Sequence, residues 1–378
     1  MNKRITTFLI CIVAIGKALL CGRANSALKL PPKNIVAMVL TSNIGDMIFA
    51  TSVFRAIKEK YPDSHLTVVG SQKNKVTLYG NNDIDEYLVD PKNSWQLIWC
   101  LRKIKADYGF SLANSSADIA VMFLSGVKSI ACFDVKNAPA AHTKLYRVLK
   151  TLCLQVPYYI GNYCSLEYLK ILEPLGIFSK NTKKYLFYDQ VIASNLRDKL
   201  KNYDLDISRE KIVAISPGAG TKIKLWPAER FAKVANFLTQ QGYRIAVIGG
   251  PSDRDEVRLF KSKLINASQI VDASEFSLGE LFYFISCCRL LVANDSGPVY
   301  IAEAFNVPTL VIVGPTDENE HPPHGPLNFV VTPSREKESP EMRGHIVGYN
   351  EQIAREQIER VTVEEVLSVL KILLNNLS

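Results

Sequence analysis

The stretch VANDSGPVYIAEAF, residues 292–305, indicates how the chain folds. It begins with a short apolar run typical of a buried strand, turns at Asp-Ser-Gly-Pro, and continues with the spacing of a helix. A strand that leads directly into a helix is the building unit of a parallel sheet covered by helices. The turn has two interpretations, because Asp295 and Ser296 can cap the helix or can help to hold an anionic ligand.

The same alternation of apolar and amphipathic runs extends over most of the chain. In the first half, strands are expected at NIVAMVL, HLTVVG, EYLVD, YGFSLAN and KSIACFD. In the second half they are expected at KIVAISPG, YRIAVIGG, QIVDAS, RLLVAND and NVPTLVIVG. Continuous apolar strands between helices predict parallel sheets buried on both faces. We therefore expect an α/β protein with two Rossmann-like domains that face a central ligand-binding cleft.

The length of 378 residues also favours two domains. We expect an apolar leader over residues 1–28, a first domain over 29–200, and a second domain over 201–378 that ends in the long helix TVEEVLSVLKILLNNL. Between the regular parts, YRVLKTLCLQV and NYCSLEYLKILEPLG are predicted as helices, and LKNYDLDISREK as the linker between the domains.

The leader combines the basic residues MNKR with the apolar run ITTFLICIVAIG. This run is too short to span a bilayer unless Lys17 is included. A cleaved signal peptide, with ANSA as its cleavage site, and a disordered leader are both alternatives. Lys17 and Arg23 interrupt the neutral end that a signal peptide needs, so we expect an uncleaved apolar helix at the inner face of the cytoplasmic membrane.

The composition narrows the classes of ligand. A net charge of +8 suits an anionic ligand or an acidic membrane surface, and the chain has no basic block interleaved with aromatic residues that would indicate nucleic acid. Its eight cysteines form no C-x-x-C pair, which favours reduced thiols in a cytosolic protein. His321 and His324 have metal-like spacing, but they lie in a proline-stiffened loop that we interpret as the rim of the cleft. We expect no metal and no cofactor.

The loop SPGAGTKIKLWP, residues 216–227, forms a second strand-to-helix corner. Gly218 and Gly220 allow backbone N–H groups to approach an oxyanion, and Lys224 adds a positive charge just before a helix. The loop matches neither the G-x-x-x-x-G-K-[ST] nor the G-x-G-x-x-G fingerprint. A glycine-rich loop with a solvated lysine is the alternative interpretation.

Two further corners place a carboxylate at a helix start. Asp253 in GGPSDRDE can interact with the helix dipole alone or can accept hydrogen bonds from ribose hydroxyls. In LTSNIGDMIFA, Asp46 can act as a cap or can accept a proton from an attacking hydroxyl, and Gly45 leaves room for a substrate beside its backbone.

Taken in order, these motifs resemble those of glycosyltransferase family 9, the heptosyltransferases of lipopolysaccharide core synthesis. The similar segments are IGDMIFATSVFRAIKEKYP, SPGAGTKIKLWPAERFA, VIGGPSDRDE and NDSGPVYIAEAFNVPTLVIVGPT, and the resemblance spans Ile35 to Thr316. It implies a GT-B fold, a nucleotide-sugar donor such as ADP-heptose, inversion at the anomeric carbon, and a lipid-linked saccharide as acceptor.

The resemblance also implies roles for individual residues. Asp46 matches the catalytic base, and Lys224 matches the lysine that contacts the donor phosphates. It matches Asp253, Asp295, Ser296 and Gly297 to donor-binding positions. With the glycine-rich loop, the other donor-binding residues are expected to be Gly218, Ala219, Gly220, Thr221, Asp253, Asp295, Ser296, Gly297 and Tyr300. The acceptor-binding residues are expected to be Asn43 and Gly45.

One position departs from the family pattern, because Tyr300 stands where the family usually has histidine. Tyrosine can hydrogen-bond a sugar or a phosphate, but it does not titrate near neutral pH as histidine does. Two alternatives to heptose transfer follow. The chain could be a family 9 transferase for another surface glycan, or a sugar-binding protein that has kept the fold without catalysis.

Overall fold

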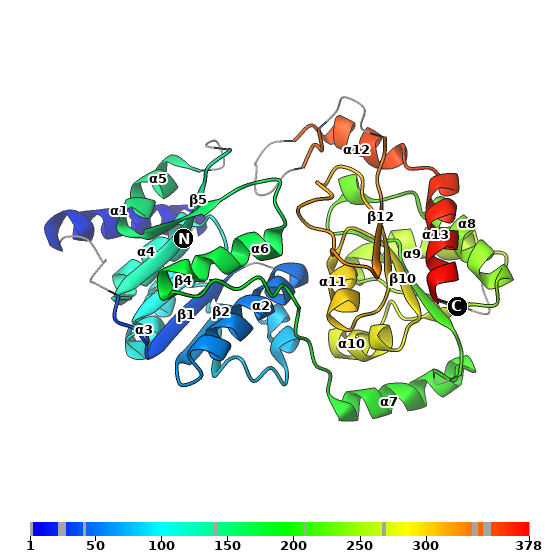
Figure 1. The fold of residues 1–378 in the computed structure, drawn as a ribbon, viewed down its shortest axis with the longest axis horizontal. Helices are drawn as coiled ribbons and strands as arrows, with labels where there is room; N and C mark the ends of the chain where they lie inside the picture. Colours follow the sequence, from blue (N-terminus) through cyan, green and yellow to red (C-terminus); the bar gives the residue numbers. More distant parts are fainter. Residues whose placement is uncertain are drawn as a thin grey trace. The chain divides into compact units, whose positions relative to one another are not determined.

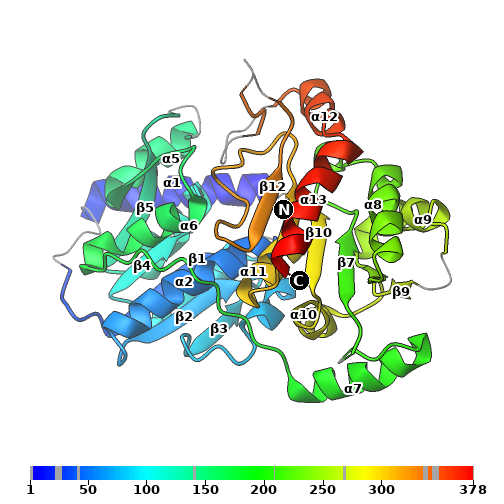
Figure 2. The same ribbon diagram turned by 45° about the vertical axis from the view of Figure 1, so that its right-hand side comes forward.

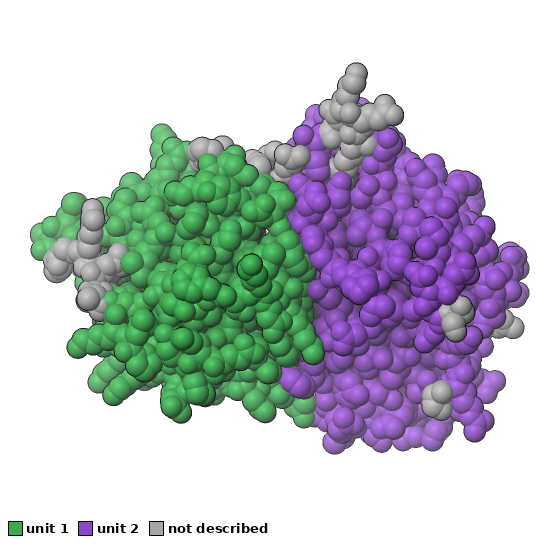
Figure 3. All heavy atoms as spheres, in the orientation of Figure 1, with its two compact units in different colours: residues 1–185, 345–347 green, residues 186–344, 348–378 purple. Residues whose placement is uncertain are grey.

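The computed structural model describes residues 3–21, 28–40, 43–138, 142–207, 209–266, 270–334, 339–342 and 349–377 (Figure 1). Contacts divide these residues into two compact units, which meet in the sequence between Tyr185 and Leu186 (Figure 3). The helix α7 (Gln190–Leu200) and the segment that follows it therefore belong to the second unit.

Each unit contains one six-stranded sheet in which all neighbouring strands are parallel, which confirms the α/β class. The strand order is β3-β2-β1-β4-β5-β6 in the first unit and β12-β11-β10-β7-β8-β9 in the second. The strands of the first sheet are β1 (Asn34–Val39), β2 (His65–Gly70), β3 (Glu86–Val89), β4 (Tyr108–Ser111), β5 (Ser129–Val135) and β6 (Leu154–Tyr158). Those of the second sheet are β7 (Ile212–Ser216), β8 (Arg244–Val247), β9 (Val271–Asp272), β10 (Leu290–Asn294), β11 (Thr309–Ile312) and β12 (Asn328–Val331).

The order of the strands fixes where each sheet can bind a ligand. In both units the chain starts at a central strand, winds to one edge, and then returns to build the other half. The connections after β1 and β4, and likewise after β7 and β10, consequently leave in opposite directions. Such a switch point opens a crevice at the carboxyl ends of the two strands, where doubly wound sheets bind ligands.

Helices cover both faces of the first sheet (Figure 1). The helices on one face are α2 (Ile44–Lys60) and α6 (Cys164–Leu169), and those on the other are α3 (Ser94–Ile104), α4 (Ser116–Ser125) and α5 (Lys144–Leu149). A further helix, α1 (Lys3–Cys21), packs against α4 and contacts α3 and α5. Because α1 and the sheet together enclose α4, every residue from Asp118 to Ser125 is buried.

Residues 3–21 of the leader therefore form a helix that packs on the first unit with one side. Ile10, Cys11 and Ala14 are fully buried in the core, and the ammonium group of Lys17 lies 5.2 Å from the centre of the Phe123 ring. Within the described ranges, no helix has the length and apolar character needed to cross a bilayer. The expected cleavage segment ANSA, residues 24–27, lies outside the described residues.

The second sheet is covered in the same manner (Figure 2). On one face lie α8 (Ala228–Gln240), α9 (Arg254–Ser262) and α13 (Val363–Leu377), and on the other α10 (Leu278–Ser286) and α11 (Gly297–Ala304). Trp226 anchors the packing before α8: it is 1% exposed, and its indole N–H donates to the carbonyl oxygen of Val361 at 2.8 Å. Ser277 and Glu280 form a capping box at the start of α10.

Several elements differ from the expectation. The helix predicted over YRVLKTLCLQV ends early, since its last residues begin β6, which pairs with β5. The sequence analysis also did not predict α7, β12 and α12 (Glu351–Glu359). β12 is only four residues long, and its extended form depends on pairing with β11 rather than on a strong local pattern.

Candidate functional site

The candidate site of the second unit lies at its switch point, where β7 and β10 are hydrogen-bonded neighbours. The fully buried side chain of Asn294 ties the two corners together there. Its amide nitrogen donates to the carbonyl oxygens of Pro217 at 2.8 Å and Gly218 at 3.3 Å, and its amide oxygen accepts from the backbone N–H of Trp226 at 3.0 Å. These bonds hold the glycine-rich loop beside the Asp-Ser-Gly turn, as the sequence predicts.

Lys224 and Asp295 form an ion pair across this junction. Lys224, at the end of the short helix η6 (Lys222–Lys224), places its ammonium nitrogen 2.8 Å from Oδ2 of Asp295. The hydroxyl of Tyr300 donates to Oδ1 of the same carboxylate at 2.9 Å. Burial alone would raise the pKa of Asp295, but the charges of Lys224 and His321 and the two hydrogen bonds outweigh it and lower this pKa to about 2. Asp295 is therefore ionised at neutral pH.

This arrangement shows that the capping interpretation of the Asp-Ser-Gly turn is wrong. Asp295 directs its carboxylate to Lys224 and Tyr300, and the hydroxyl of Ser296 donates to the carbonyl oxygen of Asn294 at 3.2 Å. The amino terminus of α11 receives no side-chain cap. Its partial positive charge is then available to an anion at this end of the sheet.

The third corner packs against the glycine-rich loop through Asp253. A Cβ atom added to Gly218 would lie 2.3 Å from Cγ of Asp253, so only glycine fits there, whereas a Cβ on Gly220 would meet nothing within 4 Å. Oδ2 of Asp253 accepts from the backbone N–H of Gly250 at 2.7 Å, and the hydroxyl of Ser252 donates to Oδ1 at 3.2 Å. All three predicted corners of the second domain thus meet at one sheet edge.

His321 belongs to the loop that the sequence analysis interprets as the rim of the cleft. It lies in the loop after β11, and its charge helps to lower the pKa of Asp295. Its Nδ1 atom lies 3.5 Å from the carboxylate of the buried Glu320. The short His-Pro-Pro-His motif, residues 321–324, is the sequence feature that could have indicated this role. Among the described residues, no group of three metal-ligating side chains is present.

The first unit presents its candidate residues at the equivalent switch point, after β1. Asn43 precedes α2, and its amide nitrogen donates to Oδ2 of Asp46 at 3.3 Å. Asp46 is half-buried in the first turn of α2, and Gly45 is buried. Burial raises the pKa of Tyr168 on α6, the charge of Asp46 adds to the rise, and α6 packs against α2, which carries Asp46.

Two buried ionisable residues of this unit carry no predictive motif. The carboxyl group of Asp118, after β4, accepts from the hydroxyls of Ser111 at 2.7 Å and Ser115 at 2.8 Å. Burial raises the pKa of Asp118 to about 6, against the effect of these hydrogen bonds, and the charge of Asp90 adds to the rise. Capping patterns such as Ser115-x-x-Asp118 are too common to identify such a group.

Lys184 is the other residue, and it is only 1% exposed. Its ammonium group donates to the hydroxyl of Tyr163 at 2.8 Å and lies 5.0 Å from the centre of the Phe49 ring, one helical turn after Asp46. A buried lysine at this place depends on partners from distant segments, so no local pattern predicts it.

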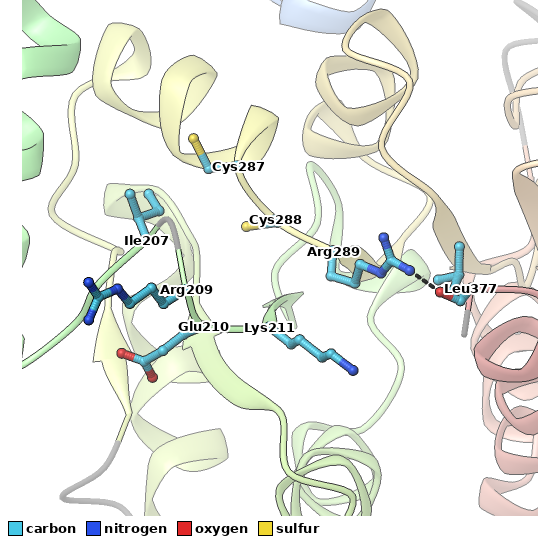
Figure 4. A pocket seen from close by; sticks show the side chains of 8 residues that line it. All are labelled: Ile207, Arg209, Glu210, Lys211, Cys287, Cys288, Arg289 and Leu377. Atoms are coloured by element: carbon cyan, nitrogen blue, oxygen red, sulfur yellow. Dashed lines mark hydrogen bonds between the residues drawn. The ribbon is translucent and has the colours of Figure 1, made fainter.

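A separate pocket of the second unit is lined by Ile207, Arg209, Glu210, Lys211, Cys287, Cys288, Arg289 and Leu377 (Figure 4). Lys211 and Arg289 immediately precede β7 and β10, so this pocket lies at the amino ends of the strands. The predicted corners follow the carboxyl ends of the same strands. The pocket is therefore not part of the candidate site.

Comparison with known proteins identifies the family. The model of glycosyltransferase family 9 (heptosyltransferase) matches residues 95–346. Lipooligosaccharide heptosyltransferase 2 of Haemophilus influenzae is 24% identical over 306 residues, which cover 76% of this chain and 85% of the relative.

Two solved structures share the fold. The family 9 glycosyltransferase of Veillonella parvula has a TM-score of 0.74 at 21% identity, covering 93% of this chain and 99% of its own. The ADP-heptose lipopolysaccharide heptosyltransferase II of Escherichia coli has a TM-score of 0.70 at 19% identity, covering 91% and 99%. With the expected order of motifs, the two doubly wound sheets and this family match, the chain belongs to glycosyltransferase family 9, the heptosyltransferase family.

Proposed function

We propose that this glycosyltransferase moves a heptose from ADP-heptose to a lipid-linked saccharide of the lipopolysaccharide core, with inversion at the anomeric carbon. The names of the Haemophilus influenzae and Escherichia coli relatives support the sugar, the nucleotide and the acceptor class. The observation that carries the proposal is the Lys224–Asp295–Tyr300 cluster beside the uncapped start of α11.

In this proposal the second unit binds the donor. The ammonium group of Lys224 has three hydrogens, and one of them donates to Asp295, which leaves two for the diphosphate. Backbone N–H groups of residues 218–221 and the start of α11 at Ser296 and Gly297 are the other phosphate ligands. Asp253 accepts hydrogen bonds from the ribose hydroxyls, and Tyr300 fixes the carboxylate that orients Lys224.

The first unit supplies the acceptor site and the base. Asn43 and Gly45 position the acceptor, and Asp46 removes the proton of its hydroxyl as the oxygen attacks the anomeric carbon. The bond from that carbon to the phosphate oxygen breaks, and its electron pair leaves with the nucleoside diphosphate. Lys224 and the dipole of α11 stabilise the developing charge. One displacement of this kind inverts the anomeric centre.

The decisive experiment is transfer by the Asp46→Ala variant. We expect turnover to fall on the order of 10²- to 10⁴-fold, the usual contribution of a general base, while the affinity for ADP-heptose stays close to that of the wild type. Asp63→Ala, at an exposed carboxylate just after the end of α2, is the matched control and should retain turnover. Turnover by Asp46→Ala at the wild-type rate would reject the base assignment.

Tyr300 stands where the family usually has histidine. For this reason, two alternatives to heptose transfer should be tested: transfer of another sugar, and sugar binding without catalysis. A transferase for another glycan would be stabilised by a different nucleotide sugar, and a sugar-binding protein would bind without turnover. A ligand at 100 times its Kd stabilises the folded chain by about 2.7 kcal/mol, so a thermal screen of nucleotide sugars separates these outcomes when it is followed by a transfer assay.

A lipid-linked acceptor is confined to a membrane. We therefore propose that the enzyme works as a peripheral protein at the inner face of the cytoplasmic membrane. The formal net charge of +8 supports this location, because that surface is anionic.

A further inference from the structure

We infer that the first unit docks flat on an anionic lipid bilayer through one face built by α1, α3 and α5. We call this surface the lipid face. The inference rests on the proposed function only in that the acceptor is lipid-linked, and it names the part of the chain that meets the bilayer.

The outer side of α1 is the first observation. Every exposed side chain between Ile5 and Leu20 is apolar. Phe8, Leu9 and Ile12 are 53%, 43% and 47% exposed and recur at the spacing of one helical face. Leu19 and Leu20, near the end of the helix, are 83% and 88% exposed. A helix on a water-exposed surface carries polar residues on that side, so this face needs an apolar environment.

The packing of α1 decides how it meets the bilayer. Ile10, Cys11 and Ala14 are fully buried in the core of the first unit, and α1 covers α4 along its outer side. The helix is ~28 Å long, from the rise of 1.5 Å for each of its 19 residues. Since one side of it belongs to the protein core, only the other side can enter lipid, and the helix lies in the plane of the interface.

The neighbouring helix α3 extends this surface with two tryptophans. Leu97, Ile98 and Leu101 of α3 face the core, whereas Trp95 and Trp99 are 47% and 59% exposed on its opposite side. Because α3 and α1 are in contact and both pack inward on the same face of the sheet, their exposed sides both point away from it. Tryptophan is enriched at the boundary between lipid and water, where its ring sits among the headgroups.

The charged residues around the lipid face indicate which kind of membrane it binds. The segments that form α1, α3 and α5 contain no aspartate or glutamate, and the first acidic residue of the whole chain is Asp46. Basic residues lie around the apolar stripe. Lys103 places its ammonium group 3.3 Å from the centre of the Trp99 ring, and Lys144 is exposed on α5. An apolar stripe on helices that carry basic but no acidic residues matches a bilayer that contains anionic lipid.

The test measures binding of the full-length protein to vesicles, without donor or acceptor. We expect co-sedimentation with vesicles that contain about one third phosphatidylglycerol, and much weaker binding to phosphatidylcholine alone. On binding, the emission of Trp95 and Trp99 should shift to the blue, whereas Trp226 is already buried and does not respond. The chain has only these three tryptophans, so W226F isolates the signal of the face.

Substitutions then locate the binding surface. F8E/I12E changes two exposed side chains without touching the buried side of α1, and we expect at least a tenfold loss of vesicle affinity. K103Q/K144Q should weaken binding to anionic vesicles by about fivefold for each lysine, since such a residue near the surface contributes on the order of 1 kcal/mol. F178E, at an apolar residue of the same unit that is 79% exposed after η4 (Lys170–Leu175), is the matched control and should bind like the wild type.

Three results would overturn the inference. One is binding of F8E/I12E equal to the wild type. Another is an equal loss with F178E. The third is a wild-type dimer that does not bind vesicles and that F8E/I12E converts to a monomer, because the face would then join two copies of the chain. Transfer to a delipidated core oligosaccharide should be the same in F8E/I12E and the wild type. If the wild type itself does not transfer heptose to this oligosaccharide, the proposed function would be rejected instead.

Discussion

The ammonium group of Lys224 lies 2.8 Å from a carboxylate oxygen of Asp295, although the two residues are 71 positions apart. The side chain of Asp295 is 2% exposed, so its charge depends on this partner for compensation. The pair joins the glycine-rich loop to the Asp-Ser-Gly turn and places both at one switch point of the sheet.

Removing the positive charge of Lys224 should destabilise the second unit. We expect K224M to lower the free energy of unfolding of the second unit by about 3–5 kcal/mol, because it leaves a buried, unpaired carboxylate. K224M/D295N should recover much of that loss, since no buried charge remains. Urea unfolding followed by Trp226 fluorescence in a W95F/W99F background measures this unit alone. A double variant less stable than K224M would contradict the ion-pair account.

The Lys224–Asp295 pair should also make the stability of the second unit depend on pH. The pKa of Asp295 is lowered from 3.8 to about 2, so its contribution to stability is complete above about pH 4 and is lost only as the pH falls through 2. In K224M burial dominates and raises this pKa, so the stability of the variant should improve as the pH falls from 7 towards 5. An equal defect of K224M at both pH values would argue against a buried charge.

Tyr300 should act through Asp295. Y300F removes one hydrogen bond to a buried carboxylate and should lower the free energy of unfolding by about 1–3 kcal/mol, less than K224M because the charge stays paired. Y300H introduces a group that titrates near neutral pH, so its rate of transfer should vary between about pH 5.5 and 7.5 more than that of the wild type. Identical pH–rate profiles would mean that position 300 does not influence the site.

Gly218 and Gly220 allow an alanine substitution that clashes to be compared with one that does not. G218A places a Cβ 2.3 Å from Cγ of Asp253 and should lower the free energy of unfolding by about 1–3 kcal/mol, whereas the space at Gly220 is open and G220A should change it by less than about 0.5 kcal/mol. Adding D253A to G218A removes Cγ and Oδ1 from the clash but leaves the Cβ of residue 253 at 2.7 Å, so the double variant should recover only part of the loss. Thermal unfolding of the three variants checks this order.

Asp118 should make the stability of the first unit fall as the pH rises. Its pKa of about 6 lies above the ordinary value of 3.8, so the folded chain binds the extra proton between these values and the penalty is complete at pH 7. D118N keeps the shape without the charge. Relative to the wild type, its free energy of unfolding should rise by up to about 3 kcal/mol between pH 4 and 7. A constant difference, measured by urea unfolding and circular dichroism, would contradict this assignment.

The docked helix α1 also changes how the leader can be studied. Deleting residues 1–28 would uncover α4, whose residues from Asp118 to Ser125 are buried beneath α1. Loss of membrane binding after such a deletion could then reflect a damaged core. Substitutions on the exposed side of α1 avoid this problem.

By itself, the sequence determined the α/β class, most strands and helices, the family, and the three corners of the second unit. These features are local: apolar runs, caps and glycine-rich turns act over a few residues. Only the tertiary structure decided that Asp295 pairs with Lys224 rather than capping α11, that Leu154–Tyr158 is a strand, and that His321 reaches the site. It also buried Asp118 and Lys184 and turned one side of α1 into the core. The reason is that burial and pairing depend on partners far away in the chain, and a side chain that can cap a helix or bind a lysine takes whichever partner the fold brings within reach.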